Sequence, residues 1–305
     1  MKTFIRVAEV WTPSAEGSPL EWAGGIYGAA PVFGAISRTL CFGRAEGLPG
    51  TAWEEGRPVL LRQLEGSYFR RTELARAAGL NCAVALPIFR GGQLTSVVVL
   101  LCGEPEAHAG AIELWHNDPR LTSDLTLAEG YFGSNGAELE ALSRDAYLPR
   151  GAGLPGMAWQ RDSAVFMDQI DHSSRFLRAQ TAATAGIVRA LALPCSTLGN
   201  QSWILSLLSS STTPIARRVE SWLPDESGQA LQRAFGFCES AGTLAADGVS
   251  LATGAGPIGQ AHASATAVAL DPIDAAPEGA PGVSAVLAIP LVSDDTVTEV
   301  LALYF

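Results

Sequence analysis

The chain has little positive charge to offer to a polyanion. It carries 20 Lys and Arg residues against 31 Asp and Glu, for a formal net charge of −11. Its basic pairs, Arg70-Arg71 and Arg217-Arg218, are too short to follow a phosphate backbone. We therefore expect no nucleic-acid partner.

Long apolar runs are missing as well. A helix needs about 18 consecutive apolar residues to span a bilayer, and the longest candidate run, Val97 to Cys102, has only the length of a strand. Glu9 interrupts the first apolar stretch, which is not typical of a signal peptide. These features predict a cytoplasmic protein without a membrane partner.

The residues of metal and catalytic sites lack the spacings that such sites need. The five cysteines include no CxxC pair, and the four histidines are widely separated. This argues against a disulfide framework and against a zinc site. Neither GxSxG nor a phosphate loop of the GxxxxGK type occurs. We predict no catalytic residues and no metal ligands.

What the chain does have is a composition typical of compact folding, with 48% hydrophobic residues, 32 Gly and 18 Pro. Its 305 residues suit two or three small domains, each with its own core. We therefore looked for internal repeats, which decide how such a chain is divided.

A Glu-x-Trp motif occurs three times. Glu9-Val10-Trp11 recurs as Glu113-Leu114-Trp115 and as Glu220-Ser221-Trp222, at steps of 104 and 107 residues. A GLPG motif follows at Gly47 to Gly50 and at Gly153 to Gly156, and a weaker copy stands at Gly256 to Gly259. Three units of about 100 residues therefore share one fold.

Each unit also repeats its later apolar strands. Ala83 to Ile88 returns as Ala190 to Cys195 and as Val286 to Leu291. In the first two units, the helix formers of Leu74 to Ala78 and of Arg178 to Ala185 precede a glycine that suits a helix end. Short helices between alternating strands indicate an α+β fold, with helices on one face of a mainly antiparallel sheet.

The ordered series EVW, GLPGTAW, PVLLRQL, YFRR, AAGL and AVALPI resembles the GAF domain, a sensor relative of PAS. The same series runs through the second unit, so the resemblance implies three tandem GAF-like domains at residues 1–104, 105–211 and 212–305. GAF proteins bind small ligands between the sheet and the helices of one face. The cofactor, if there is one, stays unknown.

The units leave little room for the helices that usually cover the back of a GAF sheet. An exposed apolar face is unfavourable by about 25 cal/mol per Å². We therefore predict that the bare sheet faces pack on one another or on a second chain, which would make the protein a homo-oligomer.

The third unit is shortened. From Gly47 to Pro87 is 40 residues and from Gly153 to Pro194 is 41, but from Gly256 to Pro290 is 34. The missing residues belong to the segment that roofs the pocket in GAF proteins, and residues 275–281 in their place should not be helical. We expect a degenerate pocket there.

The resemblance also implies pocket walls in the first two units. They are aromatic residues, arginines and one cysteine, namely Trp53, Tyr68, Phe69, Arg70, Cys82, Trp159, Phe176, Arg178 and Arg189. Aromatic residues at such positions are also typical of an ordinary core, and arginines of a surface. Arg189 stands beside a strand that should be buried, where it would need an anionic partner.

Three functions stay open at this point. The first is a non-catalytic regulatory protein that senses a small ligand and acts through self-association or a partner signalling protein. The second is a ligand-free scaffold for protein interactions. The third is a thiol-based redox enzyme, which would need Cys41 and Cys82 to converge.

Overall fold

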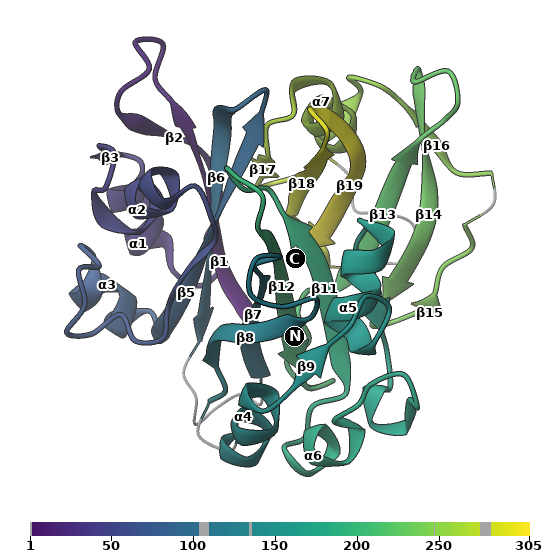
Figure 1. Ribbon diagram of the computed structural model, residues 1–305. Coiled ribbons are helices and arrows are strands. Elements are labelled where there is room, and N and C mark those ends of the chain that lie inside the picture. The colour runs from purple at the N-terminus through teal and green to yellow at the C-terminus, as the bar shows by residue number, and fades with distance from the viewer. Residues whose placement is uncertain (1, 104–109, 134–135, 247, 275–281) are drawn as a thin grey trace.

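A computed structural model describes residues 2–103, 110–133, 136–246, 248–274 and 282–305 and arranges them in three antiparallel sheets (Figure 1). We call each sheet with its helices a domain. The predicted boundary at 104/105 lies outside the described residues, and that at 211/212 lies between the second and third sheets. The boundaries themselves stay predictions.

The first sheet has the strand order β3-β2-β1-β6-β5-β4. Its strands are β1 (Ile5–Pro13), β2 (Leu20–Ile26), β3 (Cys41–Phe42), β4 (Val59–Leu61), β5 (Leu80–Arg90) and β6 (Gln93–Gly103). Its helices are α1 (Pro31–Ser37), α2 (Gly47–Glu55) and α3 (Thr72–Ala77).

The second sheet repeats this order as β9-β8-β7-β12-β11-β10. Its strands are β7 (Gly110–Asn117), β8 (Leu125–Tyr131), β9 (Tyr147–Leu148), β10 (Val165–Met167), β11 (Arg189–Cys195) and β12 (Ser202–Ser209). Its α-helices are α4 (Ala137–Arg144), α5 (Gly153–Arg161) and α6 (Ala179–Thr184), and Ile170–His172 forms a 3-10 turn.

The third sheet has the order β15-β14-β13-β19-β18-β17, with β16 also paired to β14. Its strands are β13 (Arg218–Pro224), β14 (Ala230–Cys238), β15 (Gly242–Thr243), β16 (Ser250–Ala252), β17 (Val268–Leu270), β18 (Val286–Ser293) and β19 (Thr296–Tyr304). The described residues of this domain form one helix, α7 (Gly256–Ser264).

The predicted α+β fold is confirmed, since the helices of each domain lie on the outward side of its sheet (Figure 1). The predicted helices before Gly79 and Gly186 are present as α3 and α6, and both glycines have a positive φ. Residues 275–281, which we expected not to be helical, lie outside the described residues.

The repeated GLPG motif has a structural cause. Its first glycine has a positive φ, +59° at Gly47 and +62° at Gly153, which only glycine adopts without strain. At its second glycine a Cβ atom would lie 2.0 Å from the Gly43 carbonyl oxygen in the first domain and 2.5 Å from that of Pro149 in the second. The motif therefore builds a tight turn into α2 and α5.

The backs of the three sheets share one core. Alternate residues of β1 show the division: Val7 and Trp11 face the helices, whereas Ala8 and Val10 enter a cluster that also holds residues of the second and third sheets. The prediction that bare sheet faces pack on one another is confirmed within the chain. These faces are therefore covered, and they no longer give a reason to expect a homo-oligomer.

Equivalent positions join the domains in a closed ring. On β6, the Ser96 hydroxyl accepts a hydrogen bond (3.1 Å) from the backbone N–H of Ala267, just after α7. On β19, Glu299 Oε2 accepts one (2.8 Å) from the N–H of Ala164, just after α5. The first domain thus contacts the third, and the third contacts the second.

The remaining contact of the ring has different chemistry. The residue equivalent to Ala164 is Pro58, just after α2, and a proline has no N–H to donate. The residue equivalent to Ser96 is Trp203 on β12, which offers an aromatic ring in place of a hydroxyl acceptor. The Arg57 guanidinium lies 4.9 Å from the centre of this ring. The three contacts of the ring therefore use different chemical groups at equivalent positions.

Candidate functional site

We call the face of each sheet that its helices cover the ligand face, because the GAF resemblance implies a ligand there. In the first domain this face carries a buried ion pair. The Glu9 carboxylate is fully buried and accepts hydrogen bonds from both terminal nitrogens of Arg71, at 2.6 and 2.9 Å. The Trp11 indole (3.2 Å) and the Tyr27 hydroxyl (3.3 Å) also donate to it. Arg71 further donates to the hydroxyl of Ser37 on α1. Both carboxylate oxygens of Glu9 and both terminal nitrogens of Arg71 are paired, whereas Arg71 Nε has no hydrogen-bond partner among the described residues.

The second domain repeats the cluster with equivalent residues. Arg178 donates to both oxygens of the buried Glu113, with Nη2 at 3.0 Å from Oε2, and also to the Ser143 hydroxyl on α4. Ser143 and the Trp115 indole donate to the same carboxylate, at 2.9 and 3.0 Å. The Glu of each Glu-x-Trp motif is therefore a core residue.

The short helices place these ion pairs. Arg71 and Arg178 stand directly before the first residue of α3 and of α6, the roof helices, and the two serines lie on α1 and α4. A GAF ligand would lie between these helices and the sheet. In the first two domains the protein's own side chains occupy that space.

The residues predicted as walls in the first domain do not meet around one pocket. Phe69 is buried in the core and Trp53 is half-buried against it, but Tyr68 is 48% exposed. Arg70 is exposed and pairs with Glu46 on the surface. The buried arginine is its neighbour Arg71, which we had not predicted as a site residue.

Cys82 is also placed away from the ligand face. It is fully buried in the common core behind the sheet, paired across the strands with Cys102. Its strand, β5, and that of the exposed Cys41, β3, are separated by β2, β1 and β6, or about 19 Å at ordinary strand spacing. The two thiols therefore do not converge, and burial raises the pKa of Cys82 well above its usual value.

In the second domain the predicted residues are mostly core. Phe176 and Trp159 are buried in its cluster, and Arg178 is held by Glu113. Arg189 does have the anionic partner that we expected, but that partner is Glu239 of the third domain, with bonds of 3.0 and 3.1 Å. Arg189 therefore joins two domains.

Sequence reasoning missed the glutamates, although the signal was present. A Glu two residues before a Trp on a strand shares its face, so a buried Trp at three repeats implies a buried Glu at each. A buried carboxylate requires a cation or several donors nearby. The second arginine of the Arg70-Arg71 pair was the matching cation.

In the third domain the donors to the buried glutamate, Glu220, come from strands of its own sheet. Glu220 Oε1 accepts hydrogen bonds from Arg218, two residues earlier, and from Arg233 on β14. Its Oε2 accepts from the Trp222 indole (3.1 Å) and from the Tyr304 hydroxyl (2.9 Å). The described residues of this domain include no counterparts of the serine helices or of the roof helices.

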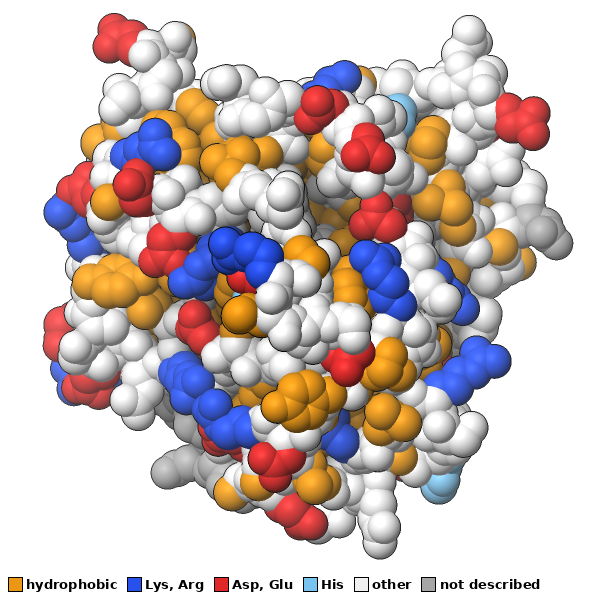
Figure 2. Space-filling model, viewed as in Figure 1, with side chains coloured by type: hydrophobic (Ala, Val, Ile, Leu, Met, Phe, Trp, Pro, Cys, Tyr) orange, Lys and Arg blue, Asp and Glu red, His pale blue; other side chains and the backbone are white. Residues whose placement is uncertain are grey.

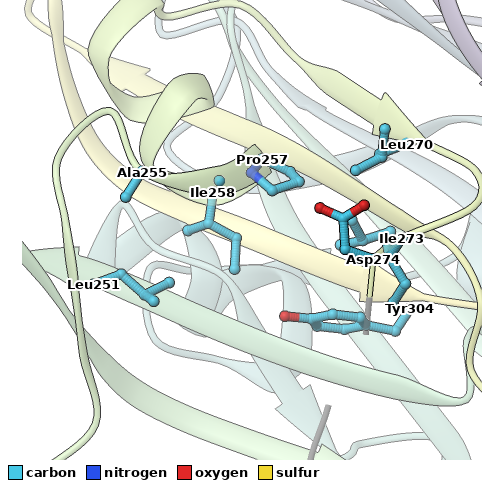
Figure 3. Close-up of a pocket in the computed structure, with 10 residues that line it drawn as sticks. Leu251, Ala255, Pro257, Ile258, Leu270, Ile273, Asp274 and Tyr304 are labelled. Atoms are coloured by element: carbon cyan, nitrogen blue, oxygen red, sulfur yellow. The ribbon is translucent and has the colours of Figure 1, made fainter. Parts of the chain in front are cut away.

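The described residues of the third domain line two cavities on this face, and Figure 3 shows residues in the wall of one of them. One cavity, of about 320 Å³, lies between the sheet and α7, with Leu251, Ile258, Val286 and Tyr304 in its walls. A second, of about 430 Å³, is lined by Arg218, Glu220, Arg233 and other residues. Leu251 and Tyr304 line both cavities. The expectation that this domain has a degenerate pocket stays a prediction, because the shortened segment, residues 275–281, lies outside the described residues.

The surface and the described residues add three observations. On the face in Figure 2, acidic and basic side chains are interspersed. Among the described residues, no group of three or more His, Cys, Asp or Glu could hold a metal ion. The described helices include none with the length and hydropathy of a membrane span.

No protein-family model and no curated protein matches the chain. Among solved structures, the chain is similar to the GAF domain of A. aeolicus nlh2 in an inactive state, at 21% identity and a TM-score of 0.27, over 32% of this chain and 58% of that one. A phosphoenolpyruvate-protein phosphotransferase (ptsP) GAF domain from Coxiella burnetii is 19% identical, with a TM-score of 0.28, over 33% and 58%. Staphylococcus aureus NreA, mutated in its nitrate binding site, is 15% identical, with a TM-score of 0.28, over 33% and 74%. With its three repeated sheets and outward helices, the chain repeats a GAF-like fold three times.

Proposed function

We propose that this chain is a cytoplasmic regulatory protein whose third domain binds a small molecule. The observation that carries the proposal is a difference at one position of the fold. Where the first two domains bury an Arg-Glu-Ser cluster under a roof helix, the described residues of the third domain line cavities of about 320 and 430 Å³, and the equivalent Glu220 lies in the wall of the larger one. The first domain also has a cavity, of about 350 Å³ beside α3, but none of its lining residues belongs to the Arg-Glu-Ser cluster. Small-molecule sites have volumes of roughly 300 to 1,000 Å³.

The first and second domains act as a scaffold in this proposal. Their ligand faces hold ion pairs in which each guanidinium binds both oxygens of a carboxylate. A ligand at that position would have to displace a buried, paired charge, which is strongly unfavourable. The scaffold function therefore belongs to two of the three domains.

A route for the signal leads from the cavity to the first domain. Ala255, Pro257 and Ile258, at the start of α7, line the smaller cavity. At the other end of α7, the Ala265 carbonyl oxygen accepts a hydrogen bond (2.5 Å) from the Thr95 hydroxyl of β6. A ligand that shifts α7 would alter this contact, and a partner signalling protein would read the change.

A redox enzyme is not supported, because the thiols that would have to cooperate lie on distant strands. The exposed Cys41 has no second cysteine within its own short strand, and Cys82 is buried. The regulatory proposal needs no chemistry from either thiol.

The test is native mass spectrometry of the full chain, with one variant and one matched control. Ala255→Phe places a large ring at the wall of the smaller cavity, at an extended backbone position that accepts it. Ala152→Phe makes the same change directly before α5 in the second domain. We expect a retained small molecule in the wild type and in Ala152→Phe, and its loss in Ala255→Phe.

Equal retention in both variants would place the ligand elsewhere and contradict the proposal. If the wild type retains nothing, a small-molecule screen by thermal shift follows. A compound that stabilises the wild type and Ala152→Phe but not Ala255→Phe would support the site. A screen in which Ala255→Phe responds as the wild type does would favour a ligand-free scaffold.

A further inference from the structure

The two cavities of the third domain differ in their chemistry. We call the smaller one the apolar half, lined by Leu251, Ile258, Leu270, Ile273 and Val286 among others. We call the larger one the arginine half, which has Arg218 and Arg233 in its wall. Leu251 and Tyr304 line both halves, so the two halves are neighbours and one molecule can contact both. Figure 3 labels these two residues among those that line the apolar half.

The arginine half has hydrogen-bond donors to spare. Glu220 already accepts five hydrogen bonds, from Arg218, Arg233, Trp222 and Tyr304, so its oxygens are saturated. Arg233 uses three of its five N–H groups, one on Glu220 and two on the Ala245 carbonyl oxygen. Two N–H groups of Arg233 can therefore serve an incoming acceptor.

The number of arginines that contact the buried glutamate also differs between the domains. One arginine meets the buried carboxylate in the first domain and one in the second, whereas two meet Glu220. Both of these arginines are largely buried, at 6% and 10% exposure of the side chain, so solvent screens them little.

Among the described residues that line the apolar half, one is charged, Asp274, and it is exposed. Solvent screens an exposed carboxylate, so it attracts a cation only weakly. The Tyr304 hydroxyl in this wall already donates to Glu220, and most of the other described side chains that line this half are aliphatic, so the half favours an aliphatic group.

We infer that the ligand of the third domain is an amphipathic anion, with an aliphatic chain in the apolar half and a carboxylate on Arg233. This inference rests on the proposed function, since it names the class of molecule that the same site takes. Hydrogen bonds between a guanidinium and a carboxylate are charge-assisted and favour planar, paired geometry.

The test is calorimetric titration of the full chain with three eight-carbon probes, which are octanoate, 1-octanol and octylamine. We expect octanoate to bind at least about tenfold more tightly than 1-octanol, which is the least that a hydrogen bond to a charged group contributes. Octylamine should bind more weakly than both. Within the series butanoate, hexanoate and octanoate, each added methylene should raise affinity about three- to fourfold.

A substitution at the arginine then locates the head group. Arg233→Met should bring octanoate down to the affinity of 1-octanol and leave 1-octanol unchanged. The matched control is Arg120→Met, at an exposed arginine of the second domain that pairs with Asp118, and it should change neither affinity. If Arg233→Met does not fold, the head-group comparison on the wild type still decides.

The outcomes separate the inference from the proposal beneath it. Equal affinity for octanoate and 1-octanol, or a preference for octylamine, would refute the inference that the ligand is an anion. The proposed binding site in the third domain would still be supported if Ala255→Phe abolishes binding. Binding of no probe overturns the amphipathic class. The proposed function fails with it only if native ligand retention is also insensitive to Ala255→Phe.

Discussion

Adjacent arginines of the first domain allow a direct test of the buried cluster. Arg71→Met would leave the fully buried Glu9 carboxylate without its cation, with the Trp11 and Tyr27 donors alone. Removing one partner of a buried ion pair destabilises a protein by about 3 to 5 kcal/mol. Arg70 is 57% exposed in its side chain and pairs with Glu46, and surface pairs of this kind contribute about 0 to 1 kcal/mol.

The measurement is the free energy of unfolding in urea for the wild type, Arg70→Met and Arg71→Met. We expect Arg71→Met to lose at least about 2 kcal/mol more than Arg70→Met, by the difference of those ranges. The double variant Glu9→Leu with Arg71→Met should recover part of the loss, because it leaves no charge unpaired. Equal losses in the two single variants, or a double variant that loses the sum of its single changes, would refute the buried-pair account.

Further predictions concern the ring contacts and the thiols. Ser96→Ala should lower the free energy of unfolding in urea by about 1 to 3 kcal/mol, because it leaves the Ala267 N–H buried without an acceptor. Ser206→Ala removes a buried hydroxyl that has no hydrogen-bond partner, so it should be close to neutral. Equal losses in the two variants would be evidence against the ring contact. Burial raises the pKa of Glu299, so the fold favours its protonated form, and stability should fall as pH rises through that raised value. Glu299→Gln should therefore flatten the pH profile of thermal unfolding and raise stability at neutral pH, and an unchanged profile would contradict this reading. In the native protein a thiol reagent should label the exposed Cys41 first, and it should label the buried cysteines only after unfolding. Mass spectrometry of the labelled chain can show this order. Fast labelling of a buried cysteine in the native protein would contradict this prediction.

The sequence predicted the architecture well because repeated motifs report on backbone requirements. The GLPG glycines recur because one needs a positive φ and the other lies against a carbonyl oxygen. Alternation along Ile5–Pro13 indicated which residues face the helices. Packing of the sheet backs followed from the lack of covering helices.

The site was harder to predict, since pocket walls depend on which side chains fill a space. Arg70 and Arg71 are neighbours of the same type, and only the start of α3 decides which of them turns inward. Arg189 needed a partner, but nothing local in the sequence pointed to Glu239, 50 residues away. The cavities of the third domain depend on how side chains of β13, β14, α7 and β19 lie relative to one another, which composition alone could not indicate.

Hydrogen exchange of the full chain with and without octanoate tests the central claim most directly. The claim is that the third domain, and neither of the other two, binds the ligand. We predict slower exchange in β16, α7 and β17, residues 250–270, with no change in the equivalent segment of the second domain, residues 147–167. Protection of 147–167, or of the equivalent residues 41–61 of the first domain, with residues 250–270 unaffected would contradict the account.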